Sequence, residues 1–220
     1  MKKLILLFGV LFSMNTVFAQ AYKPVKVDSL VTVTMPAVYT QKDTLGQHIF
    51  SATTAYGYMI AIDEPNAKGN QPLKKANDLN TIFKKYIAGI QLQSGNGSAQ
   101  NVRDTTVGAL KAKAFTLITD DGNGNILNRR FLLIYTKDAT YTFQYGYSDM
   151  RKDLVKDESK AFFGSIKLSP ALQRNDQYTD TTSKSSSIST ISIVEIAGGV
   201  LVVFVIAWLI FFRRNSNELA

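Results

Sequence analysis

An apolar run close to the C-terminus limits what this chain can fold into more than any other feature. Residues 191–212 carry one charged side chain, Glu195, and are followed directly by Arg213 and Arg214. At 1.5 Å per residue, a helix of this length spans about 33 Å, enough to cross the hydrocarbon core of a bilayer. The run is apolar all round, which does not fit a core helix with a solvent-facing side. We therefore predict a single C-terminal transmembrane helix.

The residues at the ends of this run predict its orientation. Arg213 and Arg214 favour the cytoplasmic side, so residues 213–220 form a short cytoplasmic tail and the rest of the chain lies outside. Trp208 lies where aromatic rings favour the membrane interface. Glu195 is interpreted as a carboxylate at the outer interface or, alternatively, as an intramembrane partner for a cation on another helix. A Gly-Gly pair inside the run loosely resembles a bacterial sorting tail that is removed after export, which is a second alternative.

The N-terminus carries an export signal. Lys2 and Lys3 precede a short apolar run, and Val17-Phe18-Ala19 places small residues at the two positions that a signal peptidase recognises. We expect residues 1–19 to be a bacterial signal peptide, with cleavage after Ala21 as the alternative. The two ends together predict a single-pass cell-membrane protein whose soluble part lies in the periplasm or another extracytoplasmic space.

Between the two ends we predict a domain at 22–168 and a flexible stalk at 169–190. The stalk is rich in Ser and Thr and holds too few apolar residues to offset the entropy of ordering. The chain has no Cys and one His, which excludes thiol nucleophiles, thiolate zinc sites and metal sites that need two imidazoles. Its basic residues are spread out, without an Arg-rich block, so nucleic acid is not an expected partner.

Hydrophobic periodicity predicts the fold of the domain. Alternating apolar residues predict strands at 30–35, 49–55, 56–62, 102–107, 110–119, 126–136 and 140–148. A helix is predicted from an i, i+3, i+4 stripe that is capped by Asn77 and consists of Leu79, Ile82, Phe83, Tyr86, Ile87 and Ile90. A second helix is predicted over 154–166. This order predicts an α+β domain, a twisted antiparallel sheet covered by two amphipathic helices.

One predicted strand, 140–148, carries aromatic side chains on a single face. These are Tyr141, Phe143, Tyr145 and Tyr147. Such a stripe favours a core beneath a helix, and the alternative is a platform on which a ligand stacks.

The succession of elements resembles the PsbP-like superfamily, which includes photosystem extrinsic subunits, Ran-binding import factors and bacterial exported domains. The matching segments are VTVTMP, YGYMIAID, NDLNTIFKKYIAGI, the run from VGALKAKAF to TYTFQYG, and AFFGSIKL. They cover about 30–168. The resemblance implies a non-enzymatic docking or assembly module, and it maps no functional residue onto this sequence. The stalk and the C-terminal span depart from the pattern of the extrinsic subunits.

The candidate sites for chemistry have simpler structural explanations. His48 has no motif partner. Asp63-Glu64 and Asp157-Glu158 are neighbours in sequence only, and neighbouring side chains on a strand or helix point apart. Asp121, Asn123 and Asn125 have the 1-3-5 spacing of a calcium loop, but the Gly and Glu that such a loop needs are missing. We predict no catalytic, metal or cofactor site.

The sequence thus predicts a membrane-anchored extracytoplasmic binding or assembly module whose partner is another extracytoplasmic or membrane protein. The alternatives are a carrier of lipid or another small ligand, and a hydrolase whose carboxylates meet only in the fold. The oligomeric state is left open. Loops held by a rigid scaffold often carry binding, so two polar loops are the candidate binding sites. Their residues are Asn66, Lys68 and Asn70 in the first loop, and Asp120, Asp121, Asn123 and Asn125 in the second.

Overall fold

The computed structural model describes residues 21–67, 71–95, 97–120 and 122–179. The predicted signal peptide at 1–19, the transmembrane segment at 191–212 and the tail at 213–220 lie outside these ranges. Within the described ranges, no helix combines the length and the apolar character needed to cross a membrane.

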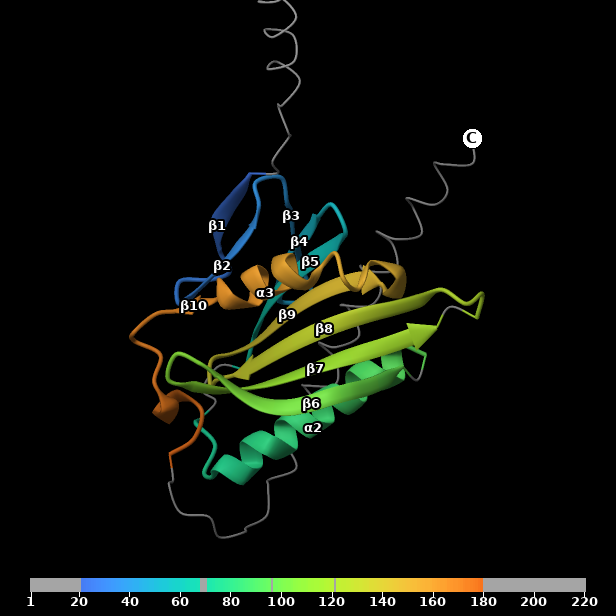
Figure 1. Ribbon diagram of the computed structural model, residues 1–220. Helices are drawn as coiled ribbons and strands as arrows, with labels where there is room; N and C mark the ends of the chain where they lie inside the picture. The colour runs from blue at the N-terminus through green and yellow to red at the C-terminus, as the bar shows by residue number, and fades with distance from the viewer. Residues whose placement is uncertain (1–20, 68–70, 96, 121, 180–220) are drawn as a thin grey trace, which may run out of the picture.

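The described strands form two antiparallel sheets (Figure 1). The larger sheet has seven strands in the order β3-β4-β5-β9-β8-β7-β6, and the smaller has three in the order β1-β2-β10. The large sheet consists of β3 (Thr40–Thr44), β4 (Gln47–Thr53), β5 (Gly57–Pro65), β6 (Ser98–Val107), β7 (Leu110–Asp120), β8 (Ile126–Tyr135) and β9 (Ala139–Ser148). The small sheet consists of β1 (Tyr22–Lys26), β2 (Val31–Pro36) and β10 (Lys167–Leu168).

Two helices lie on opposite faces of the seven-stranded sheet (Figure 1). Helix α2 (Ala76–Gln93) covers one face, and α3 (Lys156–Gly164) covers the other together with the small sheet. The prediction of an α+β domain with an antiparallel sheet and two helices is confirmed. The second sheet is a correction: the sequence predicts one sheet that includes VTVTMP, but β2 pairs with β1 and β10 instead. The sequence analysis did not predict β1, β3 or β10, because β1 and β3 are mostly exposed and β10 is very short.

The stripe predicted for the first helix is confirmed. All six of its apolar residues are buried in α2 and pack on Phe115 and Leu117 of β7 and on Phe131, Leu133 and Tyr135 of β8. The predicted cap is wrong by two residues, because the N-cap is Lys75 and not Asn77. The Asp78 carboxylate reaches back and accepts a hydrogen bond from the Lys75 amide at 3.1 Å, which places the negative charge in the positive first turn of the helix.

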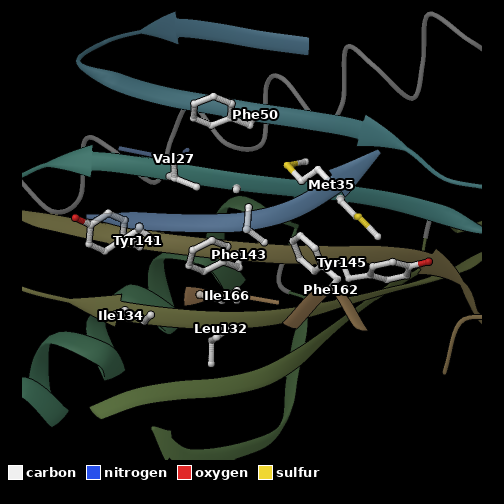
Figure 2. Close-up of a cluster of buried hydrophobic side chains, with 14 of the residues drawn as sticks. Val27, Met35, Phe50, Leu132, Ile134, Tyr141, Phe143, Tyr145, Phe162 and Ile166 are labelled. Carbon is white, nitrogen blue, oxygen red and sulfur yellow. The ribbon is translucent and has the colours of Figure 1, made fainter. Parts of the chain in front are cut away.

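The aromatic stripe of β9 forms the core on the opposite face. Its side chains are buried and pack against the small sheet and α3. Figure 2 shows Tyr141, Phe143 and Tyr145 in a row along β9, with Met35 of β2 and Phe162 of α3 beside them. The stripe is therefore core and not an open stacking platform. It lies under the small sheet as well as under a helix.

The beginning of the predicted stalk belongs to the folded domain. The sequence predicts that the domain ends at 168, whereas residues 170–179 pack against the exit of the sheet near Tyr135, with Leu172, Gln177 and Tyr178 buried. Tyr178 forms an isolated parallel bridge with Leu73, just ahead of α2. Composition misled the prediction here, because a few well-placed contacts order a polar segment. Residues 180–190 of the predicted stalk lie outside the described ranges.

Candidate docking surface

The two predicted binding loops lie at opposite ends of the seven-stranded sheet. The loop at 66–71 follows β5 and touches the turn after β8, which ends at Tyr135. The loop at 120–125 precedes β8, which begins at Ile126. Ten residues of strand at about 3.4 Å each separate them by roughly 30 Å. The two loops therefore cannot form one surface. We call the Tyr135 side the exit end and the Ile126 side the far end.

At the exit end, Asn66 has a structural role. Its amide nitrogen donates to the Thr136 carbonyl oxygen at 2.7 Å, and its amide oxygen accepts a hydrogen bond from the Thr140 hydroxyl at 3.2 Å. Its backbone N–H donates to the Asp138 carbonyl oxygen at 2.8 Å. These bonds use the polar atoms of Asn66 to close the loop onto the β8–β9 turn. Lys68 and Asn70 lie outside the described residues.

At the far end, the loop at 120–125 is the tip of the β7–β8 hairpin, as its composition predicts. The Asp120 carboxylate accepts a hydrogen bond from the Gly122 amide at 2.8 Å. Gly122 and Gly124 have φ angles of 81° and 82°, the left-handed region that favours glycine. Asn123 and Asn125 are exposed on this tip, and Asp121 lies outside the described residues.

The far end also gathers exposed apolar side chains that the sequence analysis did not single out. Large apolar residues exposed there are Val38, Tyr56, Ile126, Met150 and Leu154. Met150 is 88% exposed in the short helix that follows β9, and the neighbouring Arg151 guanidinium donates to the Tyr56 carbonyl oxygen at 3.4 Å. Exposed apolar side chains that adjoin one another mark an interaction surface, and here the Arg151 bond brings the helix that carries Met150 next to Tyr56. We call this group the far-end patch.

At the exit end, the chain leaves the domain through a tightly held segment. The Gln177 side chain is fully buried and makes three hydrogen bonds at 2.8 Å: it accepts from the Lys111 amide and donates to the carbonyl oxygens of Lys111 and Tyr135. The Thr179 amide then donates to the Leu73 carbonyl oxygen at 2.9 Å. Whatever follows residue 179 therefore begins at the end opposite the far-end patch.

The acidic pairs do not form a catalytic pair. On β5, Glu64 points to the α2 face and accepts a hydrogen bond from the Tyr86 hydroxyl at 2.8 Å. Asp63 points to the opposite face, as alternation along a strand requires. In α3, Glu158 is engaged by the hydroxyls of Tyr22 and Tyr145, which tie β1 and β9 to the helix. Burial is the main cause that raises the pKa of both phenols.

One small group of acids does meet on the small-sheet face. Burial, followed by repulsion from Asp28, raises the pKa of the Asp63 carboxyl to about 6. The Asp28 carboxylate accepts hydrogen bonds from the Leu30 and Val31 amides and from the Tyr141 hydroxyl. The described part of the chain contains no group of three acidic or His side chains placed to hold a metal ion. The hydrogen bonds of Asp28 join the loop between β1 and β2 to Tyr141 in the core.

The lone histidine lies at the exit end. His48 is partly exposed on β4, and its Nδ1 lies 2.9 Å from the Asp43 carboxylate. That hydrogen bond raises the pKa of the imidazole, with burial acting in the opposite direction. The predicted membrane-interface residues Glu195, Trp208, Arg213 and Arg214 lie outside the described residues.

Comparison with known proteins supports the fold. No protein-family model matches the chain, and no curated protein matches it in sequence. The structure is similar to the solution structure of cyanobacterial PsbP from Synechocystis sp. PCC 6803, with a TM-score of 0.50. The match covers 70% of this chain and 96% of that one. The fold is PsbP-like. At 12% sequence identity this likeness concerns the fold, and it confirms the fold that the sequence motifs imply.

Proposed function

We propose that this chain is a membrane-anchored extracytoplasmic binding module, without catalysis of its own, that presents its far end to a partner protein. One observation carries the proposal: Thr179, the last described residue, lies at the exit end, and several large exposed apolar side chains lie at the opposite end. Loops and patches on a rigid scaffold are common binding sites. The PsbP-like fold supports a docking role.

The anchor part of the proposal comes from the sequence. Residues 1–19 direct export, and residues 191–212 span the membrane. The stretch between 179 and 191 has a mean reach of about 18 Å as a flexible chain. The exit end would then face the membrane. The far end would face outward, about one strand length farther from it.

The anchor is tested by alkaline carbonate extraction of cells. We expect the full chain to stay in the membrane pellet, and a variant that stops at residue 190 to be released. Release of the full-length protein would contradict the anchor. Retention of the shortened variant would show that another part of the chain binds the membrane.

The docking surface is tested by cross-linking in intact cells with a photoreactive amino acid. We place it at Met150 in the far-end patch and, as a matched control, at Leu45, which is 81% exposed at the exit end. We expect one defined protein adduct from position 150 and none of the same size from position 45. Equal capture at both positions would contradict a far-end surface.

A second variant links the adduct to the apolar patch. With the photoreactive residue at Leu154, we expect Met150→Asp to reduce the adduct at least fivefold, because a charge replaces an exposed apolar contact. Lys160→Asp in α3, an exposed change away from the patch, should leave the adduct unchanged. An adduct that survives Met150→Asp would place the interface elsewhere.

A further inference from the structure

Three cations gather near Tyr178 at the exit end. The Lys111 Nζ atom lies 5.2 Å from the centre of the Tyr178 ring, and the Arg174 guanidinium carbon lies 5.6 Å from it. Tyr178 also forms the parallel bridge to Leu73, so Lys74 follows directly beside this ring. Figure 1 shows the orange segment after β10 next to the start of α2. We call Lys74, Lys111 and Arg174 the exit-end cation cluster.

Hydrogen bonds of the backbone hold two of these cations in place. Gln177 accepts from the Lys111 amide and donates to the Lys111 carbonyl oxygen, both at 2.8 Å. The Tyr178 amide donates to the Arg174 carbonyl oxygen at 3.1 Å. The face of the Tyr178 ring attracts both cations, although like charges repel each other. The fold therefore keeps two positive charges close together on one ring.

The acidic side chains beside the cluster have other partners. All three cations are exposed, and among the described residues none of them forms an ion pair. The Asp176 carboxylate lies 3.5 Å from the Lys137 Nζ atom, and the Asp78 carboxylate accepts a hydrogen bond from the Lys75 amide. Asp138 is exposed in the neighbouring β8–β9 turn and supplies one negative charge against three positive ones. The cluster therefore keeps a net positive charge that faces solvent.

We propose that the exit-end cation cluster binds the anionic phospholipid headgroups of the membrane that holds the anchor. The domain then rests on the bilayer by its exit end and does not float freely on its tether. This inference rests on the anchor of the proposed function. It adds a second, electrostatic contact with the membrane, and that contact sets the orientation of the domain.

The position of the cluster supports the membrane as its partner. Arg174 and Tyr178 belong to the last described segment, which ends at Thr179. A tether with a mean reach of about 18 Å keeps this end at a high local concentration near the bilayer surface. The far-end patch lies roughly 30 Å away along the strands, so it stays accessible to a partner protein while the exit end is bound.

The charge of the cluster supports the same partner. Each Lys or Arg close to an anionic leaflet strengthens association with it about fivefold. Three cations that act together favour the bound state on the order of a hundredfold. Arg174 can donate two parallel hydrogen bonds to a phosphate, whereas the two lysines act as point charges. The attraction falls off within about 8 Å at physiological salt, so cations at the far end do not take part.

The absence of cysteine from the chain allows a direct test. The mature chain, residues 20–220, is placed in nanodiscs with a fluorescent dye on Ala109→Cys, in the exposed turn between β6 and β7. Lipids that carry a nitroxide on the headgroup quench this dye only at close contact. We expect quenching at least about twofold stronger with phosphatidylglycerol than with phosphatidylcholine alone. The gain should disappear in about 1 M salt, where the screening length is about 3 Å.

Charge reversals locate the contact. We expect Lys111→Glu with Arg174→Glu to lower quenching to the level seen with phosphatidylcholine alone. Lys74→Glu, which leaves both cations on the Tyr178 ring, should remove about half of the gain.

The matched control is Lys23→Glu with Lys152→Glu, which makes the same change in net charge at exposed positions near the far end. Lys23 also lies over an aromatic ring, 4.9 Å from the centre of Tyr39, so the control removes a similar contact. Quenching should stay unchanged. An equal loss in both double variants would show an effect of net charge and would contradict the cluster as the site.

Recovery of the chain with the nanodiscs reports the anchor separately. A chain that is not retained would contradict the anchor and this inference together. A retained chain with equal quenching in both lipids would contradict this inference alone and would favour an acidic protein as the partner of the cluster. The nanodiscs contain no other protein, so quenching that depends on phosphatidylglycerol reports contact with lipid.

Discussion

The side chain of Gln177 donates a hydrogen bond to the carbonyl oxygen of Tyr135 at 2.8 Å, across 42 residues of sequence. Together with its two bonds to Lys111, this contact makes one buried amide the point where the C-terminal end of the domain is joined to the sheet. It also determines at which end the chain leaves the domain. The orientation assumed in the proposed function depends on this contact.

We expect Gln177→Ala to lower the free energy of unfolding by about 3 kcal/mol, because buried backbone groups lose their partners. The measurement is urea unfolding of residues 20–179. The matched control is Gln41→Ala on the exposed strand β3, which should change stability by less than about 0.5 kcal/mol. Limited proteolysis should also cut the Gln177→Ala variant earlier within 170–179. A variant as stable as the control would contradict the role given to Gln177.

Phe83→Ala tests the packing of α2. The ring is 2% exposed in the middle of the helix stripe, so its removal should cost about 3–5 kcal/mol in the free energy of unfolding. Leu92→Ala on the same helix removes an exposed side chain and should change stability by less than about 0.5 kcal/mol. A loss below about 1 kcal/mol for Phe83→Ala would mean that the stripe is not part of the core.

Gly146→Ala tests the close approach of Tyr58 to β9. An added Cβ at position 146 would lie 2.1 Å from Tyr58 Cζ, so the ring would have to move. We expect a loss of about 1–3 kcal/mol in the free energy of unfolding. When Tyr58 is also replaced by Ala, Gly146→Ala should lower the free energy of unfolding much less, because the Tyr58 ring that the added methyl group would meet is absent. Gly164→Ala, where a Cβ meets nothing within 4 Å, should be neutral or stabilising.

The raised pKa of the Asp63 carboxyl predicts that stability depends on pH. Burial raises its pKa from the ordinary aspartate value of 3.8 to about 6 in the folded chain, so folding favours the protonated form. Its contribution to stability is complete below the unfolded pKa and is lost as the pH rises through about 6. His48, whose pKa is also raised, acts in the same direction.

We therefore expect the free energy of unfolding of Asp63→Asn, relative to that of the unmodified domain, to be about 1–2 kcal/mol more favourable to the variant at pH 7.5 than at pH 4. The measurement is urea unfolding at both pH values. The exposed Asp157→Asn serves as the control and should show no such gain. An Asp63→Asn difference that is the same at both pH values would show that the carboxyl titrates normally.

The local pattern of apolar residues was sufficient to predict most of the fold. The six apolar residues of α2 recur at helical spacing because one side of the helix is buried. The aromatic residues of β9 alternate because successive side chains point to opposite faces, and here both faces are buried. Both patterns are properties of neighbouring residues. The sequence therefore contained them without any knowledge of the partner element, and the motifs that resemble PsbP-like domains led to the same fold.

Only the tertiary structure decided how the elements and loops are placed. The two polar loops read alike in sequence, but strand order puts them at opposite ends of β8. Residues 170–179 have the composition of a linker, yet Gln177 orders them through backbone groups far away in the chain. Composition and spacing report local preference, whereas which surfaces meet is determined by long-range pairing. The exit end and the far-end patch are both products of that pairing.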